Sequence, residues 1–66
     1  MKLTINNEPR EFNDNITVRE LLDQLNLSGQ FVAVERNYSI VPYKTFNTST
    51  LHDGDIIELV TLVGGG

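Results

Sequence analysis

The chain has 66 residues, of which 39% are hydrophobic, and it carries a net charge of −4. This length fits one small domain, which buries only about 60% of the surface that its unfolded chain exposes. The absence of cysteine excludes disulfides and cysteine-ligated metal sites. The acidic balance disfavours binding to nucleic acids and to anionic membranes, and no apolar run approaches the length of a membrane span. We therefore expect a cytoplasmic protein.

The first residues predict a β-hairpin. Residues 2–6 alternate between polar and apolar side chains, which places the two apolar ones on one face of a strand. The pair Asn6-Asn7 tolerates left-handed backbone angles and predicts a tight turn. A second strand is expected over about residues 10–13, with Phe12 directed into the core. Pro9 then stands near the start of that strand, where a missing N–H costs little.

The clearest local signal is the start of a helix. Thr17 and Glu20 have the spacing of a capping box, in which each side chain accepts a hydrogen bond from the backbone N–H of the other residue. Asn26 and Gly29 tolerate the left-handed conformation that ends many helices. We therefore predict a helix over residues 18–25. Its apolar face consists of Val18, Leu21, Leu22 and Leu25.

The second half of the chain predicts three more strands. Residues 31–36 alternate as a strand does, and residues 40–42 are long enough only for an edge strand, because Pro42 has no N–H to donate. A short helical turn is expected around Phe46. A turn at residues 53–55 then starts the last strand, residues 56–62.

This order of elements, β-β-α-β-β-β, predicts an α+β fold. A helix between two strand pairs crosses over the sheet, so the first and last strands pair in parallel at its centre. The expected architecture is the ubiquitin-like β-grasp, a mixed curved sheet packed on one main helix. We expect residues 1–62 to form this domain and residues 63–66 to form a glycine-rich tail.

The tail is the most informative feature of the sequence. Val63 is followed by Gly64, Gly65 and Gly66, and glycine is poorly suited to regular structure because it loses the most backbone entropy on ordering. Fully extended, residues 62–66 span about 16–18 Å. A thread without side chains fits a narrow channel into the active site of another protein. There the carboxylate of Gly66 is sterically free to attack the α-phosphate of a nucleotide. The alternative is a frayed end or a cloning remnant.

The chain offers little catalytic machinery of its own. His52 is the only histidine, and we expect it to be an exposed loop residue that binds no metal. Asp53 and Asp55 flank Gly54 and are expected to act only as turn formers. No serine lies in a nucleophile motif, and no glycine-rich phosphate loop opens a helix. We therefore expect no enzymatic activity and no bound cofactor.

The last strand also predicts a partner surface. If Ile57 and Leu59 face the core, alternate residues face outward, and apolar residues of the neighbouring strand join them. The predicted partner surface consists of Phe31, Ala33, Ile56, Val60 and Leu62. The alternative is that loop side chains cover it, and the candidates for this role are Tyr38, Tyr43 and Phe46.

Several of these segments together resemble a known family. The run of residues 32–37, then residues 40–42 and 53–55, and the final Gly-Gly after an apolar strand are similar to the ThiS family of thiamine-pathway sulfur carriers. The likeness covers essentially the whole chain, including Thr17 to Leu22 at the start of the helix. Each motif is ordinary by itself, but their order and spacing are specific.

The resemblance implies a cycle of reactions on Gly66. An E1-like adenylyltransferase (ThiF) uses ATP to convert its carboxylate into an acyl-adenylate. Sulfur from the persulfide of a cysteine desulfurase displaces AMP and leaves a thiocarboxylate. Thiazole synthase (ThiG) then takes this sulfur into the thiazole ring. The chain itself is implied to be a carrier that is monomeric when free.

Three other functions fit some of the same observations. The small subunit of molybdopterin synthase shares the fold, the Gly-Gly end and the thiocarboxylate. A ubiquitin-like protein modifier forms an isopeptide bond through its terminal glycine instead of donating sulfur. A β-grasp binding module with incidental glycines needs no reactive terminus.

Overall fold

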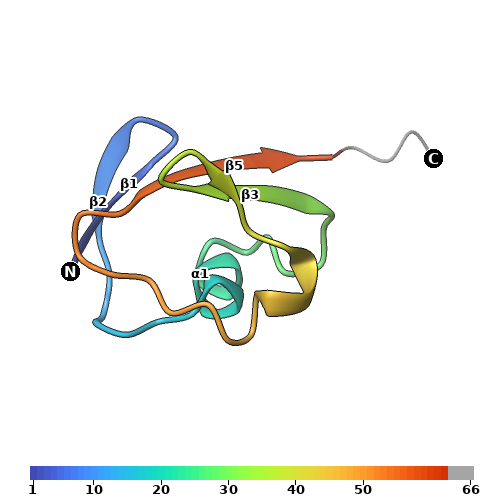
Figure 1. The fold of residues 1–66 in the computed structure, drawn as a ribbon, viewed down its shortest axis with the longest axis horizontal. Coiled ribbons are helices and arrows are strands. Elements are labelled where there is room, and N and C mark those ends of the chain that lie inside the picture. The colour runs from blue at the N-terminus through green and yellow to red at the C-terminus, as the bar shows by residue number, and fades with distance from the viewer. Residues whose placement is uncertain (63–66) are drawn as a thin grey trace.

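A computed structural model describes residues 1–62 of the chain. Figure 1 shows α1 on one side of the sheet, while within these residues no helix covers the opposite face. The elements are β1 (Lys2–Ile5), β2 (Glu8–Glu11), α1 (Val18–Gln24), β3 (Val32–Arg36), β4 (Ser39–Ile40), the 3-10 helix η1 (Tyr43–Thr45) and β5 (Ile56–Thr61).

The five strands form one mixed sheet in the order β2-β1-β5-β3-β4. β1 and β5 are parallel neighbours at its centre, and the remaining pairs are antiparallel. A parallel pair needs a long crossover, which α1 and the segment around η1 supply. The predicted α+β β-grasp architecture is confirmed, including the central pairing of the first and last strands.

The pairing of β1 with β5 is extended by one side chain. Asn6 follows β1 in the left-handed region, with φ of 48°. Its backbone N–H donates to the carbonyl of Ile57 at 2.9 Å. Its side chain donates from Nδ2 to the carbonyl of Leu59 at 3.1 Å and accepts the Leu59 N–H at Oδ1 at 2.8 Å. The side-chain amide of Asn6 thus makes the hydrogen bonds that a further residue of β1 would make. It extends the pairing with β5 by two residues, from Ile57 to Leu59.

The helix begins as the sequence predicts. Thr17 N–H donates to Glu20 Oε1 at 2.9 Å, and Glu20 N–H donates to Thr17 Oγ1 at 3.1 Å, so the capping box is complete. Asn26 has φ of 60° just after the helix, as expected for a terminating residue. The corresponding expectation for Gly29 is wrong, because of the two glycines in residues 1–62 only Gly54 has a positive φ.

The position of β2 differs from the prediction. Asn6 and Asn7 form a two-residue turn, so Ile5 pairs directly with Glu8 and the strand starts two residues earlier than expected. Pro9 therefore lies inside β2, opposite Thr4. It is tolerated because β2 is an edge strand and alternation directs the nitrogen of Pro9 away from β1.

The core lies between the sheet and α1. Ile57 and Leu59 of β5 face it, as predicted, and so does Phe46 at the end of η1, which is 3% exposed. Phe12 lies just past β2 and packs against the core while remaining partly exposed. The buried apolar side chains are Leu3, Ile5, Ile16, Val18, Leu21, Leu22, Val34, Val41, Phe46, Leu51, Ile57 and Leu59.

Asp55, expected only to form a turn, is a buried hydrogen-bond acceptor at the start of β5. Its carboxylate accepts the backbone N–H of His52 at 2.8 Å, Asn37 Nδ2 at 3.0 Å and Arg36 Nε at 2.8 Å. Burial alone would raise the pKa of Asp55, but these three donors and the charge of Arg36 lower it below its usual value. His52 is exposed, as predicted, and its Nδ1 lies 2.8 Å from Arg36 Nη2. The carboxylate thus ties the β3–β4 turn to β5.

Removing the Asn6 side chain tests its part in the central pairing. Asn6→Ala loses two hydrogen bonds to Leu59, each worth about 0.5–1.5 kcal/mol. We expect the free energy of unfolding in urea to fall by about 1–3 kcal/mol relative to the control Asn7→Ala. Asn7 has a similar left-handed φ of 71°, and its side chain makes no hydrogen bond within residues 1–62. Equal losses of unfolding free energy in Asn6→Ala and Asn7→Ala would show that the loss comes from backbone strain and not from the hydrogen bonds to Leu59.

The buried carboxylate of Asp55 predicts a pH dependence. Asp55→Asn is expected to lower the free energy of unfolding at pH 7 by about 1–3 kcal/mol, because an amide matches the three donors poorly. Since the folded pKa of Asp55 lies below its ordinary value of 3.8, its contribution is present above that pH and disappears as the pH falls through the folded pKa. The difference in unfolding free energy between wild type and Asp55→Asn should therefore become smaller in acid. A constant gap from pH 7 to pH 3, measured against the exposed control Asp23→Asn, would contradict this.

Candidate functional site

The candidate site is the end of β5, where the chain continues into the predicted tail. Leu62 N–H donates to the carbonyl of Phe31 at 2.7 Å, so the chain is still paired with its neighbour one residue before Val63. The predicted site residues Val63, Gly64, Gly65 and Gly66 lie outside the described residues. The structure therefore gives the point from which the tail starts: the exit of a central strand (Figure 1).

The predicted partner surface lies on the outer face of the sheet, as expected. Ala33 pairs with Val60 across β3 and β5. Phe31, Val60 and Leu62 are 76%, 54% and 56% exposed, whereas Ala33 and Ile56 are half-buried. We call Phe31, Ala33, Val60 and Leu62 the apolar end of the outer face, because they lie together at the end of β5.

Two acidic residues separate Ile56, the fifth residue of the predicted partner surface, from the apolar end of the outer face. Glu35 and Glu58 pair directly across β3 and β5, and the alternation of the strands places both on the outer face. They stand between Ile56 and Val60 along the face. The sequence reasoning missed this acidic pair because it depends on the register of two strands that are far apart in the chain.

The three candidate covering residues leave the outer face open. Phe46 is buried in the core on the helix side, and the ring of Tyr43 lies against it with centroids 5.3 Å apart. Tyr38 is 79% exposed at the turn between β3 and β4. Within residues 1–62, the apolar end of the outer face is therefore accessible to a partner.

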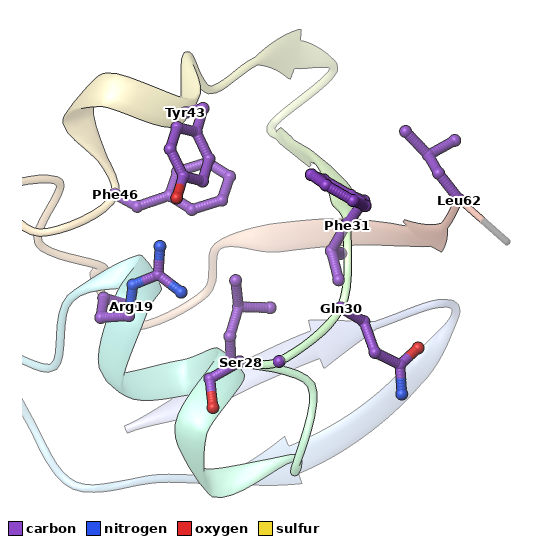
Figure 2. A pocket seen from close by; sticks show the side chains of 10 residues that line it. Arg19, Ser28, Gln30, Phe31, Tyr43, Phe46 and Leu62 are labelled. Atoms are coloured by element: carbon purple, nitrogen blue, oxygen red, sulfur yellow. The ribbon is translucent and has the colours of Figure 1, made fainter. Parts of the chain in front are cut away.

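A groove on the helix side lies beside the same end of β5. Figure 2 shows it between Phe31, Arg19 of α1 and the aromatic rings of Tyr43 and Phe46. Its volume is about 490 Å³, and Leu62 also lines it, so Phe31 and Leu62 border both this groove and the outer face. The guanidinium carbon of Arg19 lies 5.8 Å from the ring centroid of Tyr43 and 5.5 Å from that of Phe46. The sequence reasoning missed the groove because four segments that are far apart in the chain line it.

Residues 1–62 contain no cluster of three or more His, Asp or Glu side chains that would hold a metal ion. In this part of the chain no helix is both long and apolar enough to cross a bilayer.

Comparison with known proteins identifies the family. The model of the ThiS family matches residues 3–66. Over all its residues the chain is 46% identical to a thiazole synthase of Paramagnetospirillum magneticum, and it spans only 20% of that protein's length. It is 40% identical over 53 residues to the sulfur carrier protein ThiS of Bacillus subtilis, with 80% of each chain covered.

A solved structure agrees with this assignment. The crystal structure of the thiamine biosynthesis protein ThiS from Geobacter metallireducens matches with a TM-score of 0.85 and 33% identity over the full length of both chains. The fold, the order of the motifs and the sequence likeness thus point the same way, and the chain belongs to the ThiS family.

Proposed function

We propose that the chain carries sulfur for thiazole formation, as a thiocarboxylate at Gly66, and that it is a substrate of other enzymes and not a catalyst. One observation carries the proposal. The central strand β5 ends at Thr61, and only two residues separate it from a segment of three glycines, in a family that includes a named sulfur carrier. A carboxylate at the end of such a segment is the least hindered acid that a protein chain provides.

The chemistry begins with activation, because a carboxylate has no leaving group. In the proposed first step, an oxygen of the Gly66 carboxylate attacks the α-phosphate of ATP in the active site of the adenylyltransferase ThiF. Pyrophosphate leaves, and the product is an acyl-adenylate. The chain itself binds no nucleotide in this scheme, since ATP belongs to the partner enzyme.

Sulfur then replaces AMP. The terminal sulfur of a cysteine desulfurase persulfide attacks the activated carbonyl carbon, AMP leaves, and an acyl disulfide forms. A thiol reductant supplies two electrons to cleave its S–S bond, which frees the thiocarboxylate. Because the chain has no cysteine, it offers no thiol of its own that would compete in this exchange.

Thiazole synthase (ThiG) is the proposed acceptor of the sulfur. The likeness of the whole chain to a fifth of a thiazole synthase supports this pairing, because a similar segment forms part of that polypeptide. The same comparisons favour the thiamine carrier over the molybdopterin synthase subunit and over a protein modifier. We propose that the apolar end of the outer face contacts these enzymes while the tail enters their active sites.

Deletion of Gly66 tests the adenylation step. The shortened chain places its carboxylate one residue, about 3.5 Å, short of the α-phosphate. We expect ATP–pyrophosphate exchange by the cognate adenylyltransferase to be lost. Glu8→Ala, on the far edge strand β2, serves as the control and should retain exchange. Exchange at the wild-type rate in the deletion variant would refute the step.

An acidic substitution on the apolar end tests the partner surface. Val60→Asp is expected to weaken binding to the adenylyltransferase at least tenfold, or about 1.4 kcal/mol, because a charge would be buried in the interface. The adjacent control Thr61→Asp places the same charge on the opposite face of β5. Both variants should keep the wild-type melting temperature to within a few degrees, since both side chains are exposed. Equal affinities of Val60→Asp and wild type would show that the surface is wrongly placed.

A further inference from the structure

One edge of the sheet is left without a partner beside the groove. Along a strand, the peptide groups of successive residues face opposite edges. Two hydrogen bonds show which residues of β3 face β5. Leu62 N–H donates to the carbonyl of Phe31, and Asn37 N–H donates to the carbonyl of Ile56, each at 2.7 Å. The peptide groups of odd-numbered residues in β3 therefore face β5. Those of Val32 and Val34 face the opposite edge.

On that opposite edge β4 covers only the second half of β3. Glu35 pairs with Ile40, and Arg36 pairs with Ser39. Val41 N–H donates to the carbonyl of Val34 at 2.9 Å, and the chain then leaves the sheet through Pro42 into η1. The N–H and C=O of Val32 consequently make no backbone hydrogen bond within residues 1–62. Val34 lies opposite Val41 and is only 1% exposed, so the open part of this edge is at Val32.

These groups lie beside the groove that Figure 2 shows, because Val32 lines it. Phe31, Tyr43 and Phe46 line it as well. Tyr43 is 73% exposed at the mouth, and Phe46 forms part of the apolar wall. An unpaired strand edge is a template for pairing with another chain, and an adjacent apolar pocket selects one of its side chains.

The charge in the groove is opposite in sign to the net charge of the chain. The chain has a net charge of −4, but the charged residue lining the groove is Arg19. Its guanidinium is half-buried against the two rings, and within residues 1–62 it has no carboxylate at salt-bridge distance. The complementary ligand therefore carries a negative charge.

We propose that the open edge of β3 and this groove bind, by strand addition, an extended segment of an enzyme that holds the tail. The segment pairs with Val32 through two backbone hydrogen bonds, inserts an apolar side chain beside Tyr43 and Phe46, and places a carboxylate on Arg19. This inference rests on the proposed function. Leu62, from which the tail continues, lines the same groove, so an enzyme holding the tail has this edge within its contact area.

Amide hydrogen exchange tests the proposed pairing at the level of single N–H groups. The full chain is exchanged alone and in separate complexes with the adenylyltransferase and with thiazole synthase, and is then released and measured by NMR. With at least one enzyme, we expect the amide of Val32 to exchange at least tenfold more slowly than in the free chain. Ala33 is the internal control, because its N–H faces β5 in both states.

Three results would overturn the inference. An unchanged exchange rate at Val32 in both complexes would show that the edge stays open. Protection in the free chain that rises with concentration, together with a dimeric mass, would assign the edge to a second copy. Failure of the chain to form a complex with either enzyme would overturn this inference together with the proposed function, whereas the first two results leave the proposed function standing.

Matched substitutions test the side chains of the groove. We expect Arg19→Glu to raise the Kd for the protecting enzyme at least tenfold and Arg10→Glu to change it less than twofold. Arg10 is a suitable control because its guanidinium carbon also lies 5.8 Å from an aromatic centroid, that of Phe12, but away from the groove. Equal effects of the two variants would assign the result to net charge and contradict the proposal.

A second pair of variants removes an aromatic ring without changing charge. Tyr43→Ala is expected to weaken the complex at least fivefold, and Tyr38→Ala is expected to leave it unchanged. The two tyrosines are similarly exposed, at 73% and 79%, and only Tyr43 lines the groove. If Tyr43→Ala keeps the wild-type affinity and melting temperature, the ring of Tyr43 does not form an apolar subsite, which contradicts this part of the proposal.

Discussion

The parallel pairing of β1 with β5 is the constraint on which the rest of the structure depends. It places the last strand between two neighbours, so that the backbone of β5 is bonded on both sides. Asn6 lengthens the pairing on the β1 side, and Phe31 bonds Leu62 on the β3 side. The tail therefore starts from one of the best-supported strands in the sheet, although the domain as a whole is small.

This arrangement suits a carrier better than a catalyst. A chain of this size has one core, and that core fills the space between the sheet and α1. The surfaces that remain lie on either side of the end of β5: the apolar end of the outer face and the groove beside Arg19. Under the proposed function, both are placed to contact an enzyme that takes the tail. In that scheme the domain provides recognition, and its partners provide the reactive groups.

The parts of the fold that sequence reasoning predicted are those decided by nearby residues. The capping box joins residues three apart, and the alternation of Ile57 and Leu59 within one strand sets which face of β5 is buried. The order of elements then restricted the possible sheet topologies to a few, because a parallel central pair of strands needs a crossover connection. The start of β2 was misplaced because the tight Asn6-Asn7 turn brought Pro9 into the strand, where an edge position accommodates it.

The features that the sequence did not predict depend on residues far apart in the chain. Asp55 receives two of its three hydrogen bonds from side chains 18 and 19 residues away, so the local sequence does not predict its burial. The acidic pair of Glu35 and Glu58 follows only from the register of β3 against β5. The groove joins α1, the loop after it and η1. Family resemblance predicted the chemistry of the tail but none of these arrangements.

The central claim is that the terminal carbonyl of Gly66 bears the transferred sulfur. Intact-mass spectrometry of the chain purified from cells starved of thiamine tests it most directly. The account predicts a species heavier by the difference between one sulfur and one oxygen atom, with the added mass confined to the C-terminal peptide. Finding only unmodified chain, or chain joined through Gly66 to other proteins, would contradict the account.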